Sequence, residues 1–253
     1  MKIFKISFLL FILALPSLAK IRSGEELITA MHDKYDGKWY KTLTFQQQTI
    51  NYLADGTSNS TIWYEAMSVP GRLRIDIAPV ENKGGMLFSD GKLFSFRDGK
   101  QTAERPLMHP LLLLGFDVYA QPVKKTLEQL ASLNIKMSIL RTGKWQGKAV
   151  YIVGANPGDL TSPQFWIDKK ELLFVRLLVP GGANKKSTNE TQFNKYVKMK
   201  GGGWVAAEVQ FIVNGKLSTS EVYSDIRTGI ELNEDLWNPA KWASVERKHF
   251  VVK

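Results

Sequence analysis

The sequence predicts a mainly β protein with one large, curved antiparallel sheet of about ten or eleven strands. Apolar and polar residues alternate in many short segments, most regularly over residues 205–213, as they do in half-buried strands. Turn signals such as Asp90-Gly91 and Asn214-Gly215 separate neighbouring segments, and such pairs are typical of tight hairpins. Strands do not alternate regularly with helices, which argues against a parallel α/β sheet.

Residues 1–19 have the pattern of a secretory signal peptide. Lys2 and Lys5 precede an apolar core at residues 6–15, and Ala19 ends a run of small residues suited to cleavage. The core is too short to span a bilayer, so an uncleaved membrane anchor is the less favoured alternative. We therefore expect an exported protein cleaved after Ala19, with residues 20–253 forming a single domain.

Composition narrows the function classes further. The 253 residues include no cysteine, which excludes a disulfide, a Cys nucleophile and a lipid attached through an N-terminal Cys. The mature protein is therefore expected to be soluble and not lipidated. The formal net charge is +10, but the basic residues are scattered along an exported chain, so we expect no nucleic-acid partner. A solvated surface is the simplest explanation, and weak attraction to anionic membranes is the alternative.

The first element after the signal is predicted to be a helix that ends at Asp36-Gly37. Ser23 and Glu26 have the spacing of a capping box at its start. Leu27, Met31 and Tyr35 then recur on one side, so this helix has an apolar stripe that must pack against another element.

The clearest sheet region lies within residues 69–100. A strand there has two chemically different faces, and a hairpin through Ser89-Asp90-Gly91 follows it, with Arg97-Asp98-Gly99-Lys100 as a second turn. One face of the strand carries Leu73, Ile75 and Ile77, and the other carries Arg72, Arg74 and Asp76. Further strands are expected at residues 43–52, 61–67, 135–140, 148–153, 165–168, 172–179, 191–199, 205–213 and 217–226. A loop is expected from Pro180, and a short helix from Asn238-Pro239.

A strongly apolar segment, residues 105–120, separates the two groups of strands. It contains four consecutive leucines between Pro110 and Gly115, and a second helix is expected at residues 123–133. The leucine run is too short to cross a membrane and too apolar to be an exposed helix. It could be a lid over an apolar cleft or a helix fixed in the core, and the sequence leaves both interpretations open.

Catalytic motifs were sought and not found. His32, His109 and His249 are far apart and have no metal-ligand spacing, and no Gly-x-Ser-x-Gly elbow or phosphate-binding glycine loop occurs. Acidic residues in turns, such as Asp90 and Asp168, suit local backbone hydrogen bonds. A pair of distant carboxylates could still serve a glycosidase, but nothing favours it. We expect no enzyme activity, no cofactor and no metal site.

Several motifs resemble the LolA-like family of periplasmic lipoprotein-sorting proteins. They are Pro-Gly-Arg-Leu-Arg-Ile-Asp from Pro70, Phe-Ser-Asp-Gly-Lys-Leu-Phe-Ser-Phe from Phe88, the leucine run after His109, Phe-Trp-Ile-Asp from Phe165, and Asn-Pro-Ala-Lys-Trp from Asn238. The resemblance implies an incomplete antiparallel β-barrel with a helical lid over an apolar cavity that holds acyl chains. It also implies a periplasmic location. One departure stands out, because Val69 occupies the position of an Arg that the family's carrier uses for cargo handling.

These observations predict a lipid or lipoprotein carrier that buries acyl chains reversibly. It is expected to be a monomer that meets partner proteins at the inner or outer membrane. The alternative is a non-enzymatic protein-binding or envelope-sensing module whose cavity is filled by its own side chains. The predicted cavity wall is Phe45, Trp63, Leu73, Ile75, Phe88, Phe94 and Phe96. The predicted lid is Leu111, Leu112, Leu113, Leu114 and Phe116.

Overall fold

A computed structural model describes residues 20–181 and 187–250. The signal peptide expected at residues 1–19 lies outside this range, as do residues 182–186 of the expected loop, whereas Pro180 and Gly181 belong to a strand. No helix within the described range is long and apolar enough to cross a membrane.

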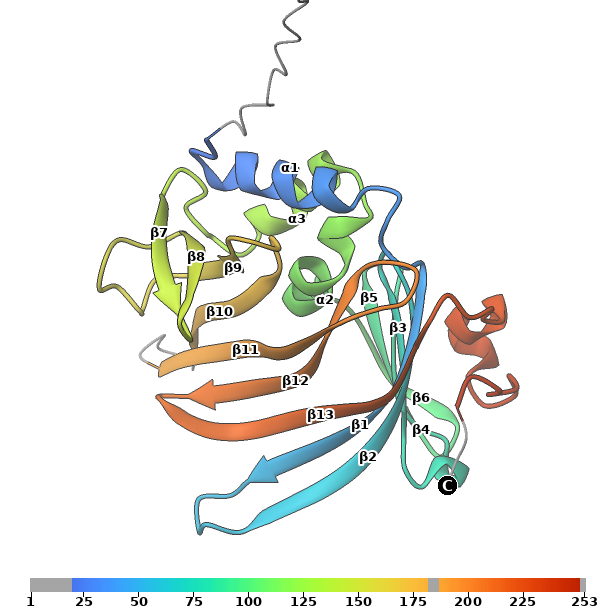
Figure 1. The fold of residues 1–253 in the computed structure, drawn as a ribbon. Helices are drawn as coiled ribbons and strands as arrows, with labels where there is room; N and C mark the ends of the chain where they lie inside the picture. Colours follow the sequence, from blue (N-terminus) through green and yellow to red (C-terminus); the bar gives the residue numbers. More distant parts are fainter. Residues whose placement is uncertain (1–19, 182–186, 251–253) are drawn as a thin grey trace, which may run out of the picture.

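Thirteen antiparallel strands form one strongly curved sheet in the order β6-β5-β4-β3-β2-β1-β13-β12-β11-β10-β9-β8-β7 (Figure 1). The described strands β6 and β7 lie at opposite edges and do not pair, so the sheet stays open. This confirms the mainly β fold class and the incomplete barrel. The strands are more numerous than the ten or eleven expected.

The first half of the chain forms one helix and six strands. Ser23 caps α1 by accepting a hydrogen bond from the Glu26 N–H at 3.2 Å, while the Glu26 carboxylate accepts from the Arg22 N–H at 2.7 Å. Leu27 and Met31 are completely buried, as the apolar stripe predicts. The elements are α1 (Gly24–Tyr35), β1 (Thr42–Tyr52), β2 (Ser58–Ser68), β3 (Arg72–Ile77), the 3-10 turn η1 (Val80–Asn82), β4 (Gly84–Ser89), β5 (Lys92–Arg97) and β6 (Lys100–Pro106).

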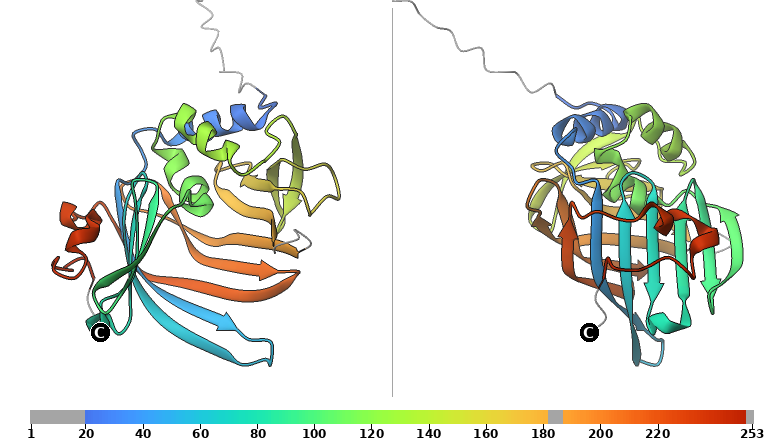
Figure 2. Two further views of the ribbon diagram at one scale, coloured as in Figure 1. Left: turned by 180° about the vertical axis from the view of Figure 1, so that it is seen from behind. Right: turned by 90° about the vertical axis from the view of Figure 1, so that its right-hand side faces the viewer.

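A helical segment then crosses to the concave side of the sheet, where it lies beside α1 (Figures 1 and 2). It consists of α2 (Pro110–Gly115), η2 (Asp117–Tyr119) and α3 (Val123–Ala131). Tyr119 fixes it to the rest of the core, because its ring stacks on Trp39 at 4.0 Å and its hydroxyl accepts a hydrogen bond from the Phe174 N–H at 3.0 Å.

The second half completes the sheet with seven strands. The strand expected at residues 135–140 is wrong, because these residues follow α3 in turns and β7 begins only at Leu140. Asn134 has a positive φ, and the Met137 carbonyl accepts a hydrogen bond from Gly24 at the start of α1. The elements are β7 (Leu140–Trp145), β8 (Lys148–Val153), β9 (Gln164–Asp168), β10 (Phe174–Gly181), β11 (Ser187–Lys198), β12 (Trp204–Val213), β13 (Lys216–Thr228), η3 (Glu234–Trp237) and η4 (Pro239–Lys241).

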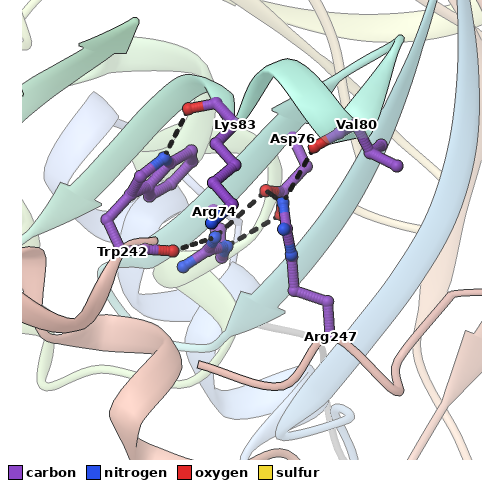
Figure 3. A network of polar contacts seen from close by, with 6 residues as sticks. All are labelled: Arg74, Asp76, Val80, Lys83, Trp242 and Arg247. Atoms are coloured by element: carbon purple, nitrogen blue, oxygen red, sulfur yellow. Dashed lines mark hydrogen bonds and ion pairs between the residues drawn. The ribbon is translucent and has the colours of Figure 1, made fainter. Parts of the chain in front are cut away.

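The C-terminal segment lies across the convex face of β1–β6, opposite the helices (Figure 2). Arg74 and Asp76 of β3 are completely buried beneath it and form a two-pronged ion pair with N–O distances of 2.7 and 3.0 Å (Figure 3). Trp242 lies over the Arg74 guanidinium at 3.7 Å and also stacks on Phe96, and Arg247 donates a third hydrogen bond to Asp76 at 3.0 Å. The sheet is therefore covered on both faces in this region.

Candidate functional site

The concave face and α2 enclose a cavity of about 340 Å³, which is within the size range of small-molecule sites. It is lined mostly by apolar and aromatic side chains from ten elements and the adjoining loop. They are Phe45, Gln47, Trp63, Glu65, Met67, Leu73, Ile75, Met86, Phe88, Leu93, Arg105, Leu107, His109, Leu111, Leu112, Phe116, Phe193, Val209, Phe211, Glu221 and Tyr223.

Strand register explains how these side chains meet. In an antiparallel sheet, residues directly opposite each other point to the same face, so each set of paired residues forms a row across the sheet. One row on the concave face is apolar from β1 to β5, where it consists of Leu43, Met67, Leu73, Phe88 and Leu93; it ends at Thr228 on β13 and at Arg105 on β6. The adjacent rows contain Phe45 with Glu65, then Gln47 with Tyr223, then Thr49 with Glu221. The concave face thus becomes more polar along β1 toward the β1–β2 turn.

Five of the seven predicted wall residues line this cavity: Phe45, Trp63, Leu73, Ile75 and Phe88. Phe94 and Phe96 do not, and their assignment to the wall is corrected. They point to the convex face, where they pack in a second core with Leu236, Trp237 and Trp242. The reason is the two-residue turn, which places Leu93 opposite Phe88 and Phe94 opposite Leu87.

Some of the predicted lid residues also line the cavity and others do not. Leu111, Leu112 and Phe116 line the cavity, whereas Leu113 and Leu114 are absent from its lining and are buried. The segment is tied down beyond the helix, since the Asp117 carboxylate accepts a hydrogen bond from the Gly71 N–H at 2.9 Å. α2 is therefore a wall of the cavity on one side and a part of the core on the other.

Two carboxyl groups in the cavity are absent from the sequence-based prediction. Glu65 is 4% exposed, and no described residue donates a hydrogen bond to its carboxyl group. Glu221 accepts a hydrogen bond from the Tyr223 hydroxyl at 3.0 Å. Burial raises the pKa of Glu221 to about 7, and burial together with the Glu221 charge raises the pKa of Glu65 well above its usual range. The sequence does contain a signal for the position of Glu65, because side chains alternate along a strand and Glu65 therefore shares a face of β2 with Trp63 and Met67.

His109 closes the cavity at the start of α2. Its Nδ1 accepts the Leu112 N–H at 3.4 Å as an N-cap, and its ring meets Phe88 edge-on at 4.9 Å. Burial lowers the pKa of His109 to about 4, so the imidazole is neutral at pH 7. A neutral acceptor suits the N-cap role, since a protonated ring could only donate.

This histidine makes the fold sensitive to acid. Between pH 6.5 and 4 the unfolded chain takes up a proton that the folded chain excludes, so stability falls as the pH falls. At pH 5 this costs about 2 kcal/mol relative to pH 7. His109→Asn keeps a capping acceptor and removes the titration. In urea unfolding, we expect the wild type to lose about 2 kcal/mol more than the variant between pH 7 and 5. Equal losses would contradict this role.

The described residues contain no group of three His, Asp or Glu side chains that could hold a metal ion. The histidines are separated: His32 contacts Asp33, His109 caps α2, and His249 is buried under the convex-face segment.

Comparisons with known proteins identify the architecture. No model of a known protein family matches the sequence, and no curated protein matches it either. Solved structures do match. A domain from Vibrio parahaemolyticus, provisionally named as an outer membrane lipoprotein-sorting protein, superposes with a TM-score of 0.60 at 14% identity, covering 87% of this chain and 98% of that one. A LolA superfamily protein from Nitrosomonas europaea superposes with a TM-score of 0.54 at 9% identity over 83% and 97% of the two chains.

This chain has the LolA-like fold. A DUF1329 family protein from Desulfovibrio piger shares it, with a TM-score of 0.57 and 12% identity over 87% of this chain and 97% of that one. In this LolA-like chain, Val69 is buried in the main core. The nearby arginines face away from the cavity: Arg72 pairs with Glu234 at 2.8 Å, and Arg74 lies in the convex-face network. No arginine of β3 therefore substitutes for the carrier's Arg inside the cavity.

Proposed function

We propose that this protein is a periplasmic carrier that shields the acyl chains of a lipoprotein or lipid in its apolar cavity. The observation that carries the proposal is the cavity itself, which is bounded by α2 and by the row that is apolar from β1 to β5 on the concave face. The names of the structural neighbours in Vibrio and Nitrosomonas agree with such a role. The signal-like residues 1–19 agree with export.

The mechanism is reversible burial. Each methylene that leaves water for the cavity contributes about 0.8 kcal/mol, so a chain of several carbons binds with useful affinity without any covalent step. Release then requires a partner that offers a better apolar site or that displaces α2.

The first test is uptake of a neutral apolar probe. We expect N-phenylnaphthylamine to become fluorescent on binding the mature protein, and lipid purified with the protein to displace it. Native mass spectrometry of protein isolated gently from the periplasm should show extra mass that organic solvent removes. A bare polypeptide mass together with no probe uptake would overturn the carrier function and favour the protein-binding module.

A further inference from the structure

The polar part of the cavity contains acid groups without a basic partner. Glu65 on β2 and Glu221 on β13 both face the cavity, with Gln47 of β1 between them. Gln47 is uncharged and cannot neutralise them: its amide donates to the Thr49 hydroxyl at 2.8 Å and, close to Glu221, only partly offsets the effect of burial on the pKa of that carboxyl group. Buried carboxylates are normally paired with a cation or hydrogen-bonded by several donors, and here Glu65 has neither among the described residues.

The other titratable groups around the cavity do not supply the missing charge. Arg105 is exposed on the edge strand β6, with β3, β4 and β5 between it and Glu65. His109 lies beside α2 and is neutral at pH 7, because burial lowers its pKa. Tyr223 already donates to Glu221. The vicinity of the two carboxyl groups is therefore acidic, although the whole chain carries a net charge of +10.

Aromatic side chains lie next to these two carboxyl groups. Phe45 stacks on Tyr223 at 4.3 Å, and strand pairing places Phe45 directly opposite Glu65. Trp63 is the next residue toward the β1–β2 turn on this face of β2. Carboxylates together with aromatic faces are the usual protein environment for a substituted ammonium group, which gains both ion-pair and cation–π energy.

Resting on the proposed function, we infer that the cavity binds an amphiphile whose head group carries a positively charged nitrogen. The ammonium group lies between the carboxylates of Glu65 and Glu221, and the alkyl tail runs along the apolar row toward Leu111, Leu112 and Phe116. The polarity gradient of the concave face matches this orientation. An anionic head group would instead lie beside two acids whose ionisation it opposes, so it gains no ion pair there.

Binding of the cation is coupled to loss of a proton. Both carboxyl groups favour the protonated form in the empty cavity, because burial raises the pKa of each. A bound cation stabilises the ionised form, so affinity for a permanent cation rises with pH through about 7, whereas affinity for a neutral ligand of equal length has no such rise.

The test compares three ligands of one chain length below their micelle concentrations, each by displacement of N-phenylnaphthylamine at pH 7.5. They are decyltrimethylammonium, decanol and decanoate. We expect the cation to bind about tenfold more tightly than the alcohol, and decanoate to bind most weakly. The Glu65→Gln/Glu221→Gln variant should lose the preference for the cation while still binding decanol.

Glu104→Gln is the control, because it makes the same Glu-to-Gln change at an exposed residue of the same sheet, outside the cavity. It should keep the wild-type preference. If the double variant unfolds, the pH dependence of cation binding in the wild type replaces it, and a flat profile overturns the inference. Equal binding of all three ligands would overturn the inference and leave the carrier function standing. Failure of every ligand, the neutral probe included, would overturn both.

Discussion

Replacing Asp76 by Asn is expected to destabilise the protein by about 3–5 kcal/mol. Asp76 is completely buried and receives hydrogen bonds from Arg74 and Arg247 (Figure 3). The uncharged amide leaves the fully buried Arg74 guanidinium and the mostly buried Arg247 guanidinium without this counter-charge, and removing one partner of a buried ion pair leaves its desolvation cost uncompensated. Urea unfolding at pH 7 measures the change directly.

Glu234→Gln provides the control for that experiment. Glu234 also pairs with an arginine of β3, Arg72, at a similar distance of 2.8 Å, but its side chain is 78% exposed. We expect a change within about 1 kcal/mol of wild type, since solvent screens exposed pairs. A comparably small effect of Asp76→Asn would show that the C-terminal segment does not depend on this network.

Replacing Leu112 by Glu is expected to weaken binding of a neutral apolar probe by at least about tenfold. Leu112 is 7% exposed and lines the cavity from α2, so the new carboxylate either lies inside the apolar space or moves the helix. The sheet should stay folded, because Leu112 lies on the side of α2 that faces the cavity and the strands pair with one another without α2. Far-UV circular dichroism and the urea midpoint check the fold, and probe fluorescence checks binding.

Two further variants make this result interpretable. Leu160→Glu adds the same charge at a loop residue that is 47% exposed, and it should bind the probe normally. Leu112→Ala removes side-chain volume without adding charge and should keep most of the binding. Wholesale unfolding of Leu112→Glu would instead identify α2 as a fixed part of the core.

The sequence predicts most strands because their signals are local. Alternation and Asp-Gly or Asn-Gly turns depend on neighbouring residues only, and the hairpins at Asp90 and Asn214 form as expected with positive φ at both residues. The strand expected at residues 135–140 is wrong for a reason that is not local. That segment is apolar enough for a strand, but its backbone turns to meet the start of α1, a contact between residues distant in the sequence.

The errors in the site have two causes. The positions of Phe94 and Phe96 could have been predicted, because a two-residue turn fixes the register and a shift of one residue reverses the face. The complete burial of Arg74 could not, since its cover, Trp242, comes from a segment more than 160 residues later. The face of β2 on which Glu65 lies could have been predicted. That its neighbour there is a second acid, Glu221, and not a basic residue follows only from the pairing of β13 with β1.

The strand order has a consequence for how the chain folds. Within β1–β6 and within β7–β13, each strand pairs with the strands that precede and follow it in the sequence, so each half can form from successive hairpins. Among the described strands, the ladder between β1 and β13 is the one that joins the two halves of the sheet, and it pairs Leu43 with Thr228. Closing so long a loop is entropically unfavourable and slow. While the chain folds, β1 therefore has an unpaired edge until β13 pairs with it, and the chain is most open to aggregation or to a chaperone during this interval.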